Sequence, residues 1–191
     1  MKQDIILCGV GGQGILSIAT VIAQAATAAG LHIKQAEVHG MSQRGGDVQS
    51  NLRLSTEQIF SDLIPGGAAD LIIAMEPMEA LRYVPCLNAD GAVVSAAENL
   101  VNIPDYPDPA AVRNALDALP RAEVAEIGRI AREAGNPKGA NMVLLGMASK
   151  YIRILPASAL REAIAVIFAA KGQDIIDANL RAFDRGAGDT L

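Results

Sequence analysis

The sequence predicts an α/β fold: a Rossmann-like, mostly parallel sheet flanked by helices, with a helix-rich C-terminal third. Short apolar runs of strand length alternate with stretches in which apolar residues recur at helical spacing. A glycine-rich turn joins the first run to the first helical stretch. With 191 residues the chain is long enough for one sizeable core and short for two, so we expect residues 1–191 to form a single domain.

The first elements follow from apolar runs and their punctuation. Asp4–Cys8 is an apolar run of strand length, and the apolar residues that recur from Ile15 onward predict a helix. Gly30 is placed to end that helix, because glycine favours the left-handed conformation of a helix C-terminus. His32–Val38 is the next expected strand, and a glycine-bearing polar loop follows it to Asp47.

The middle of the chain predicts three strands. Residues 48–54 alternate between an apolar and a polar face, which predicts a half-exposed strand in a hairpin with Ile59-Phe60. Asp70–Met75 is a continuous apolar run typical of a central strand, and Glu76-Pro77 opens a helix with proline in its first turn. Asn88–Gly91 predicts a turn before a short buried strand at 92–95.

The remaining sequence has mostly helical periodicity. A proline-punctuated crossing, Pro104–Pro109, is too short and too rigid to be a flexible domain linker. Beyond it we expect a helix at 110–119, a strand at 122–127, and helices at 127–134, 141–155, 157–169 and 173–185.

Composition and charge restrict the possible partners. Hydrophobic residues make up 51% of the chain and charged residues 19%, below the roughly 25% that is typical. We therefore expect surplus apolar surface that meets another protein, the alternative being a tightly packed, alanine-rich monomer. The net charge of −5 argues against nucleic acid or an anionic membrane as partner. Charged and polar residues also interrupt the apolar stretches before the ~18 residues of a membrane span.

The cysteines and histidines do not predict a metal centre. Two cysteines, Cys8 and Cys86, cannot supply the four thiolates of an iron–sulfur cluster. Neither cysteine stands at a sequence separation from His32 or His39 that is typical of zinc ligands. Cys8 is expected to be a small buried hydrophobe. Without a disulfide framework or a secretory signal, the cytoplasm is the expected compartment.

A glycine turn follows the first expected strand and opens the first expected helix, with the sequence Gly9-Val10-Gly11-Gly12-Gln13-Gly14. In this context glycine allows positive φ, lets the backbone approach a ligand and exposes the helix N-terminus to an anion. Glu37 stands near where a dinucleotide site has its acidic residue. The extra glycine, the glutamine and the lack of a substrate domain weaken that interpretation. Another phosphate-bearing ligand, or a close-packed turn without any ligand, remain alternatives.

A second glycine cluster has the sequence Gly40-Met41-Ser42-Gln43-Arg44-Gly45-Gly46-Asp47. A guanidinium flanked by polar and glycine residues can bind phosphate or carboxylate through two parallel hydrogen bonds. The alternative is a surface loop in which Arg44 pairs with Glu37 or Asp47. Further along, Asn141 is expected to cap a helix, with Lys138 as a possible anion contact.

Groups for bond-making chemistry are not apparent in the sequence. The two histidines have no neighbouring nucleophile in a plausible triad pattern. The glycine turn is followed by Ile15-Leu16 rather than by the lysine and hydroxyl residue of a nucleotide-hydrolysing loop. We therefore expect no catalytic residue on this chain.

The two glycine clusters together resemble those of a known family. The turn at 9–14, an alanine-rich helix and then Val38-His-Gly-Met-Ser-Gln-Arg-Gly-Gly-Asp-Val48 resemble the gamma-type subunits of 2-oxoacid:ferredoxin oxidoreductases. The glutamine-bearing form of the loop, with Gly135-Asn-Pro-Lys-Gly-Ala-Asn-Met142 further on, is most similar to the beta subunits of the indolepyruvate enzymes. The resemblance runs from about Ile5 to Phe183.

This resemblance implies a division of labour between subunits. The chain would be a small subunit without clusters in an enzyme that oxidatively decarboxylates a 2-oxoacid to an acyl-CoA, and the form of the loop implies indolepyruvate or another aryl pyruvate as that 2-oxoacid. A large alpha subunit would hold thiamine diphosphate, Mg²⁺ and [4Fe–4S] clusters and pass electrons to ferredoxin in a hetero-oligomer. Coenzyme A would be the co-substrate. The expected ligand-binding residues are Gly9, Gly11, Gly12, Gln13, Gly14, Arg44, Gly45 and Gly46.

Other classes of function remain alternatives to this one. A stand-alone Rossmann-type protein would bind NAD(P) or FAD as an isolated chain, with Glu37 on the ribose. A purely structural interaction domain would leave the glycine turn empty. Arg44 itself would serve either a ligand or docking against the large subunit.

Overall fold

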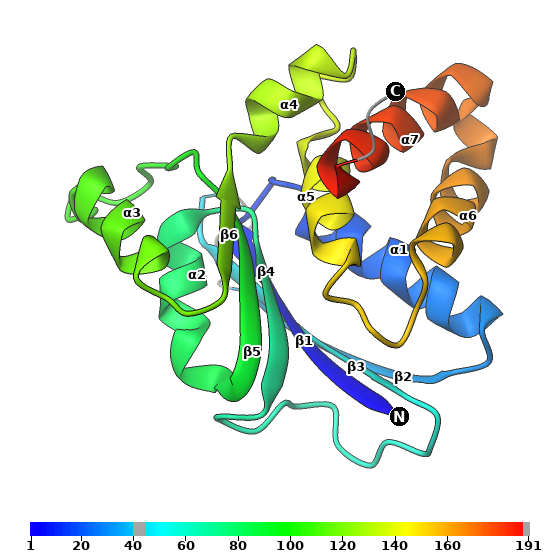
Figure 1. Cartoon of the computed structure of the whole chain (residues 1–191), viewed down its shortest axis with the longest axis horizontal. Coiled ribbons are helices and arrows are strands. Elements are labelled where there is room, and N and C mark those ends of the chain that lie inside the picture. The colour runs from blue at the N-terminus through cyan, green and yellow to red at the C-terminus, as the bar shows by residue number, and fades with distance from the viewer. Residues whose placement is uncertain (40–44, 189–191) are drawn as a thin grey trace.

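The computed structural model describes residues 1–39 and 45–188 (Figure 1). Within these residues six strands form one sheet in the order β2-β3-β1-β4-β5-β6. The strands are β1 (Lys2–Val10), β2 (His32–His39), β3 (Asp47–Ser55), β4 (Ala69–Ala74), β5 (Leu87–Ala96) and β6 (Ala122–Ala125).

The sheet is mixed, with one reversed strand. β1, β4, β5 and β6 pair in parallel, whereas β3 pairs antiparallel with both β1 and β2. β2 therefore runs in the same direction as β1, so the prediction of a mostly parallel sheet is confirmed. The topology differs from a Rossmann sheet in one respect: β3 lies between β1 and β2 and separates them.

Helices cover both faces of the sheet (Figure 1). α1, α5, α6 and α7 pack on one face around the larger apolar core, and α2 and α3 pack on the other face around a smaller core. The helix-rich C-terminal third is confirmed. The helices in the described chain are α1 (Ile15–Ala28), α2 (Pro77–Tyr83), α3 (Pro109–Asp117), α4 (Ile127–Glu133), α5 (Ala140–Ser149), α6 (Ala157–Phe168) and α7 (Gln173–Ala187), with short 3-10 turns η1 (Val84–Cys86) and η2 (Ala169–Lys171).

Local sequence accounts for where several helices begin and end. Gly30, at φ +70°, follows α1 and its N–H donates to the Thr27 carbonyl, as expected for a glycine that ends a helix. Pro77 occupies the first turn of α2, where a missing N–H costs nothing. The Glu76 carboxylate caps the same helix by accepting from the Glu79 N–H at 2.9 Å.

The strand at 47–55 is buried rather than half-exposed, and its predicted hairpin with Ile59-Phe60 is wrong. β3 lies inside the sheet, and its residues from 50 to 55 are all buried. The polar side chains of β3 can be buried because they have partners on neighbouring elements. Arg53 lies opposite Asp4 of β1, and its Nε and Nη2 donate to the Asp4 carboxylate at 2.9 and 3.1 Å.

Two other predicted boundaries are wrong for reasons of tertiary packing. Asn88–Gly91 is not a turn but the first part of β5, at a shift of register against β4. Asparagine and glycine suit such a bulge as well as a turn. The helix predicted at 141–155 ends at Ser149. Ile152 and Leu155 continue the apolar pattern because they fill the core from a non-helical segment.

The contact between α5 and α7 requires glycine on each helix. A Cβ on Gly146 would lie 2.0 Å from the Phe183 carbonyl oxygen, and a Cβ on Gly186 would lie 2.0 Å from the Val143 carbonyl oxygen. Both clashes are with backbone, which cannot rotate away. The two helices therefore approach through their backbones, and every α5 residue from Met142 to Ser149 is buried.

We predict that Gly146→Ala destabilises the fold by about 2–3 kcal/mol, because an added methyl group in a close-packed contact forces the helices apart. Chemical unfolding monitored by circular dichroism measures the change. Gly66→Ala is the matched control, since in the described chain a Cβ there has no heavy atom within 4 Å. An equal unfolding midpoint for both variants would contradict this account of the α5–α7 contact.

Candidate functional site

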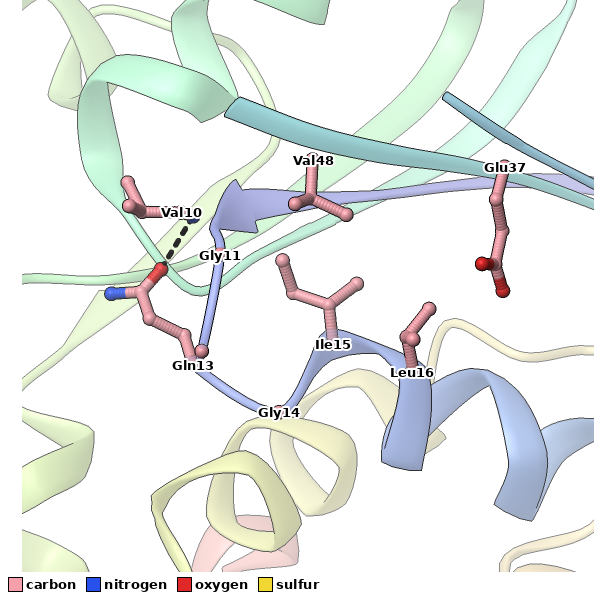
Figure 2. Close-up of a pocket in the computed structure, with 9 residues that line it drawn as sticks. Val10, Gly11, Gln13, Gly14, Ile15, Leu16, Glu37 and Val48 are labelled. Atoms are coloured by element: carbon pink, nitrogen blue, oxygen red, sulfur yellow. Dashed lines mark hydrogen bonds between the residues drawn. The ribbon is translucent and has the colours of Figure 1, made fainter. Parts of the chain in front are cut away.

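A cavity of about 390 Å³ opens where β1 ends and α1 begins. Its size lies within the range of small-molecule sites, about 300–1,000 Å³. Figure 2 shows the glycine turn along one side, with Val48 of β3 and Glu37 of β2 opposite the start of α1. The lining residues are Val10, Gly11, Gly12, Gln13, Gly14, Ile15, Leu16, Glu37 and Val48.

The glycine turn adopts a conformation that favours glycine at two positions. Gly12 has φ +101° and Gly14 has φ +85°, and Gly14 is the residue that precedes α1. No side chain of the described residues caps this helix, and its first turn carries no acidic residue. The Ser17 N–H donates to the Gly14 carbonyl at 3.1 Å, so the N–H groups of α1 before Ser17 are the ones offered to a ligand, and the helix dipole favours an anion there.

The Gln13 side chain is part of the scaffold of the turn. Its Oε1 accepts from the Val10 N–H at 2.7 Å, and its Nε2 donates to the Met75 carbonyl at 3.2 Å. Figure 2 shows it bent back toward Val10 and away from Ile15 and Leu16. Gln13 thus ties the turn after β1 to the end of β4. The glutamine, which weakened the interpretation of the turn as a dinucleotide site, therefore has a structural role.

Gly9 does not line the cavity. A Cβ there would lie 2.8 Å from both Gln13 Oε1 and Ile15 Cδ1, so the absence of a side chain lets the turn and helix close over the strand.

Asn141 does not cap a helix, contrary to the prediction from the sequence. It lies inside α5, which Gly139 precedes, and its Nδ2 donates to the Gly14 carbonyl at 3.3 Å. This contact supports the turn from the side of α5.

The structure brings the two glycine clusters together. The Gly11 N–H donates to the Gly46 carbonyl at 2.8 Å, and the neighbouring Gly45 carbonyl accepts from Asn102 Nδ2 at 2.8 Å. We call Gly45-Gly46 the second glycine segment. Arg44 lies outside the described residues. The described parts of both clusters lie at the same edge of the sheet, where β1 ends and β3 begins.

The cavity is mainly apolar with one acidic side chain. Val10, Ile15, Leu16 and Val48 form the walls, and Leu16 is 48% exposed. Glu37 is exposed, and its Oε1 accepts from Gln35 Nε2 at 2.7 Å. A carboxylate repels phosphate and accepts from hydroxyl or amine donors. The site therefore has two chemically different ends: N–H donors at the start of α1 and an acceptor at Glu37.

A third chain segment, residues 97–107, lies beside the second glycine segment. It is fastened by the fully buried Glu76, whose Oε1 accepts from the Tyr106 hydroxyl and, at 3.3 Å, from the Leu100 N–H. Asn99 Nδ2 donates to the same hydroxyl at 2.9 Å. Sequence reasoning assigned only Pro104–Pro109, as a proline-punctuated crossing, and expected Glu76 only at the start of a helix. It missed the contacts among Glu76, Asn99 and Tyr106 and the role of Asn102, since only the fold brings these residues together.

These surroundings change the acid–base behaviour of nearby groups. Burial, followed by the hydrogen bond to Glu76, raises the pKa of Tyr106 to about 12. Burial, followed by the charges of Glu79 and Glu76, raises the pKa of the Cys8 thiol well above its ordinary value. Cys8 is fully buried, so the expectation of an unreactive, hydrophobe-like thiol agrees with the structure.

The described residues contain neither a metal centre nor a membrane span. Between residues 1 and 39 and between 45 and 188, no group of three or more histidine, cysteine, aspartate or glutamate side chains is arranged to hold a metal ion. None of the helices in these ranges combines the length and apolar character needed to cross a bilayer.

Comparison with known proteins decides the family. Residues 4–188 match the family described as pyruvate ferredoxin/flavodoxin oxidoreductase. The chain belongs to this family. It is 36% identical to the indolepyruvate oxidoreductase subunit IorB of Archaeoglobus fulgidus, over 97% of this chain and 94% of that protein. The corresponding subunit of Thermococcus kodakarensis is 34% identical, over 97% and 95% of the two chains.

Solved structures of the family share the fold. The pyruvate oxidoreductase subunit of Thermotoga maritima superposes with a TM-score of 0.75 at 24% identity, over 98% of this chain and 96% of that chain. A 2-oxoglutarate:ferredoxin oxidoreductase from Magnetococcus marinus, solved with 2-oxoglutarate, coenzyme A and succinyl-CoA bound, gives a TM-score of 0.74 at 23% identity. That match covers 98% of this chain and 30% of the other.

The resemblance inferred from the two glycine clusters is thereby confirmed. The chain is a small subunit of the 2-oxoacid:ferredoxin oxidoreductase type, an enzyme component. The alternative of a stand-alone NAD(P)- or FAD-binding protein receives no support from these relatives.

We predict that no tyrosine of the folded protein ionises in its usual range. The chain has three tyrosines and no tryptophan, so ultraviolet absorbance reports tyrosinate directly. Burial first of all raises the pKa of Tyr83 and Tyr106 to about 12, and burial also raises that of Tyr151. Titration should begin above the ordinary pKa of about 10 in the folded protein and near it in denaturant.

The same shifts set the direction of the alkaline stability change. Because the folded-state pKa values exceed the unfolded ones, their stabilising contribution is complete below about pH 10 and is lost toward about pH 12. Tyr106→Phe should remove one of the tyrosines whose pKa is raised to about 12. A normal titration of native protein would contradict the burial of these phenols.

Proposed function

We propose that this chain is the small subunit of an indolepyruvate:ferredoxin oxidoreductase, which oxidatively decarboxylates an aryl pyruvate to an acyl-CoA and passes the electrons to ferredoxin. The observation that carries the proposal is similarity along the whole chain to subunits of that enzyme. Four IorB proteins are 33–36% identical to it over 97–98% of its length.

In this proposal the redox cofactors reside on a large alpha subunit. Thiamine diphosphate and its Mg²⁺ supply decarboxylation chemistry, and [4Fe–4S] clusters carry electrons, but this chain does not fit the clusters. Its two cysteines, Cys8 and Cys86, are fewer than the four thiolates that one cluster requires. Both are free thiols, as is typical of a reducing compartment, and we propose the cytoplasm.

Relatives in which this unit is part of a longer chain support a hetero-oligomer. The ketoisovalerate oxidoreductase subunit VorA of Methanothermobacter thermautotrophicus is 31% identical over 95% of this chain, which spans only 35% of VorA. In such proteins the same unit is covalently joined to further domains. Here we propose that residues 1–191 form one domain and that non-covalent assembly brings it to those partners.

Apolar surface supports the same assembly. Phe60 is 86% exposed and Val101 is 66% exposed, and large apolar side chains at such exposure are typical of a surface that another protein covers. Leu63, Leu100 and Ile103 lie in the same two segments and are also exposed.

We further propose that the glycine clusters bind part of coenzyme A. The open N–H groups at the start of α1 and the Arg44 guanidinium would bind phosphate, and Glu37 would accept from a hydroxyl or amine at the other end of the cavity. The proposed ligand-binding residues are Gly11, Gly12, Gly14, Arg44, Gly45 and Gly46, with Gly9 and Gln13 acting through the shape of the turn.

Anaerobic purification of the chain with its native partners tests the proposed function. We expect a brown complex with a large cluster-bearing subunit that reduces ferredoxin when indolepyruvate and coenzyme A are added. Pyruvate and 2-oxoglutarate serve as controls for the substrate class. A colourless monomer or homodimer without a companion would contradict the proposal, and the isolated chain would then be tested for dinucleotide binding.

We predict that Arg44→Ala in the assembled enzyme raises KM for coenzyme A about tenfold or more, the loss expected for one charge-assisted hydrogen bond of roughly 1.5–3 kcal/mol. Steady-state kinetics at saturating indolepyruvate measure it. Arg113→Ala is the control, because that exposed arginine pairs with Asp117 on α3. Unchanged kinetics together with a weakened complex would instead assign Arg44 to subunit docking.

A further inference from the structure

Asn102 occupies an unusual place between two exposed apolar neighbours. Val101 and Ile103 are 66% and 41% exposed, whereas Asn102 is half-buried and its Nδ2 donates to the Gly45 carbonyl at 2.8 Å. Only the amide nitrogen can donate to a carbonyl, so this contact fixes which way the amide faces. Asn102 Oδ1 is then shielded from solvent without a hydrogen-bond donor among the described residues.

The Asn102 side chain connects two loops. Its Nδ2 hydrogen bond to the Gly45 carbonyl is the tether between the segment that carries Asn102 and the second glycine segment.

The segment that carries Asn102 is itself held at both ends. Glu76, fully buried, accepts from the Leu100 N–H on one side of Asn102 and from the Tyr106 hydroxyl on the other. Glu76 also caps α2 and adjoins Met75, whose carbonyl accepts from Gln13. Asn102 therefore projects from a segment anchored to the same strand end as the glycine turn.

These contacts form a closed path that begins and ends in the glycine turn. Gly11 bonds to Gly46, Gly45 bonds to Asn102, the segment of Asn102 bonds to Glu76, and Met75 bonds to Gln13, which lies two residues after Gly11. Each of these links is a hydrogen bond between two loops or between a loop and a strand end. Removing the Asn102–Gly45 bond therefore leaves the second glycine segment held to this path through the Gly11–Gly46 bond alone.

We propose that Asn102 is a positioning residue, which holds the second glycine segment against the glycine turn so that both face one ligand. Its link to catalysis rests on the proposed function. Asn102 touches no reacting group; it acts through Gly45 and Gly46. Without Asn102, the second glycine segment is no longer held at a fixed distance from the start of α1.

Hydrogen exchange of the Gly11 N–H tests the tether in the isolated chain. Asn102→Ala should speed exchange at Gly11 at least fivefold, with the unfolding midpoint unchanged. Asn102→Asp, of the same size but unable to donate to a carbonyl when ionised, should do the same. Asn88→Ala is the matched control, because Asn88 also donates one side-chain hydrogen bond, to Asp70 at the opposite edge of the sheet.

Kinetics of the assembled enzyme test the positioning role. With indolepyruvate saturating, Asn102→Ala should raise KM for coenzyme A about fivefold while kcat changes less than twofold, and Asn88→Ala should leave both unchanged. Unaltered exchange at Gly11 would overturn the tether. Faster exchange with unaltered KM would overturn the positioning role. If wild-type enzyme showed no turnover, the proposed function alone would fail, and exchange would still decide the tether.

Discussion

The buried ion pair between Asp4 and Arg53 sets the register on which the rest of the site depends. Both residues are almost completely buried, and all three guanidinium nitrogens donate: Nε and Nη2 to Asp4, Nη1 to the Ser61 and Leu63 carbonyls. Shifting β3 by one residue against β1 would turn Arg53 to the opposite face and leave the buried Asp4 carboxylate with only the half-exposed Lys2 ammonium as a charged partner, which is strongly unfavourable. The pair therefore specifies one alignment.

That alignment determines what meets at the far end of the strands. With Asp4 opposite Arg53, Val10 lies opposite Asp47, and the next residues on each side, Gly11 and Gly46, form a hydrogen bond. The insertion of β3 also moves Glu37 two strand spacings from β1, about 10 Å, instead of one. A glycine turn that resembles a dinucleotide fingerprint thus stands beside a second glycine segment, in an arrangement that Rossmann enzymes do not have.

Sequence reasoning succeeded where the signal is local. Gly30, Pro77 and the central strand at 69–74 each follow from a few adjacent residues, and so does the glycine turn. It failed where the deciding partner is distant: β3 is buried because of Asp4, and Asn88–Gly91 is extended because β4 runs alongside. Glu76 was expected to open a helix, and it does, but its contacts to residues 97–107 and the role of Asn102 carried no signal in the sequence, since they depend on residues that the fold brings near.

The site has the properties of a surface that binds and positions. Its donors are backbone N–H groups at the start of α1, its walls are apolar, and its one acidic side chain, Glu37, is exposed. Behind it, α5 is buried from Met142 to Ser149 and packs closely on α7 at Gly146, so the turn at the start of α1 rests on a close-packed helix pair. In the proposed enzyme, the contribution of this chain to the site is the placement of these groups. Because that geometry arises from three loops at one sheet edge, it is set by the hydrogen bonds between the loops.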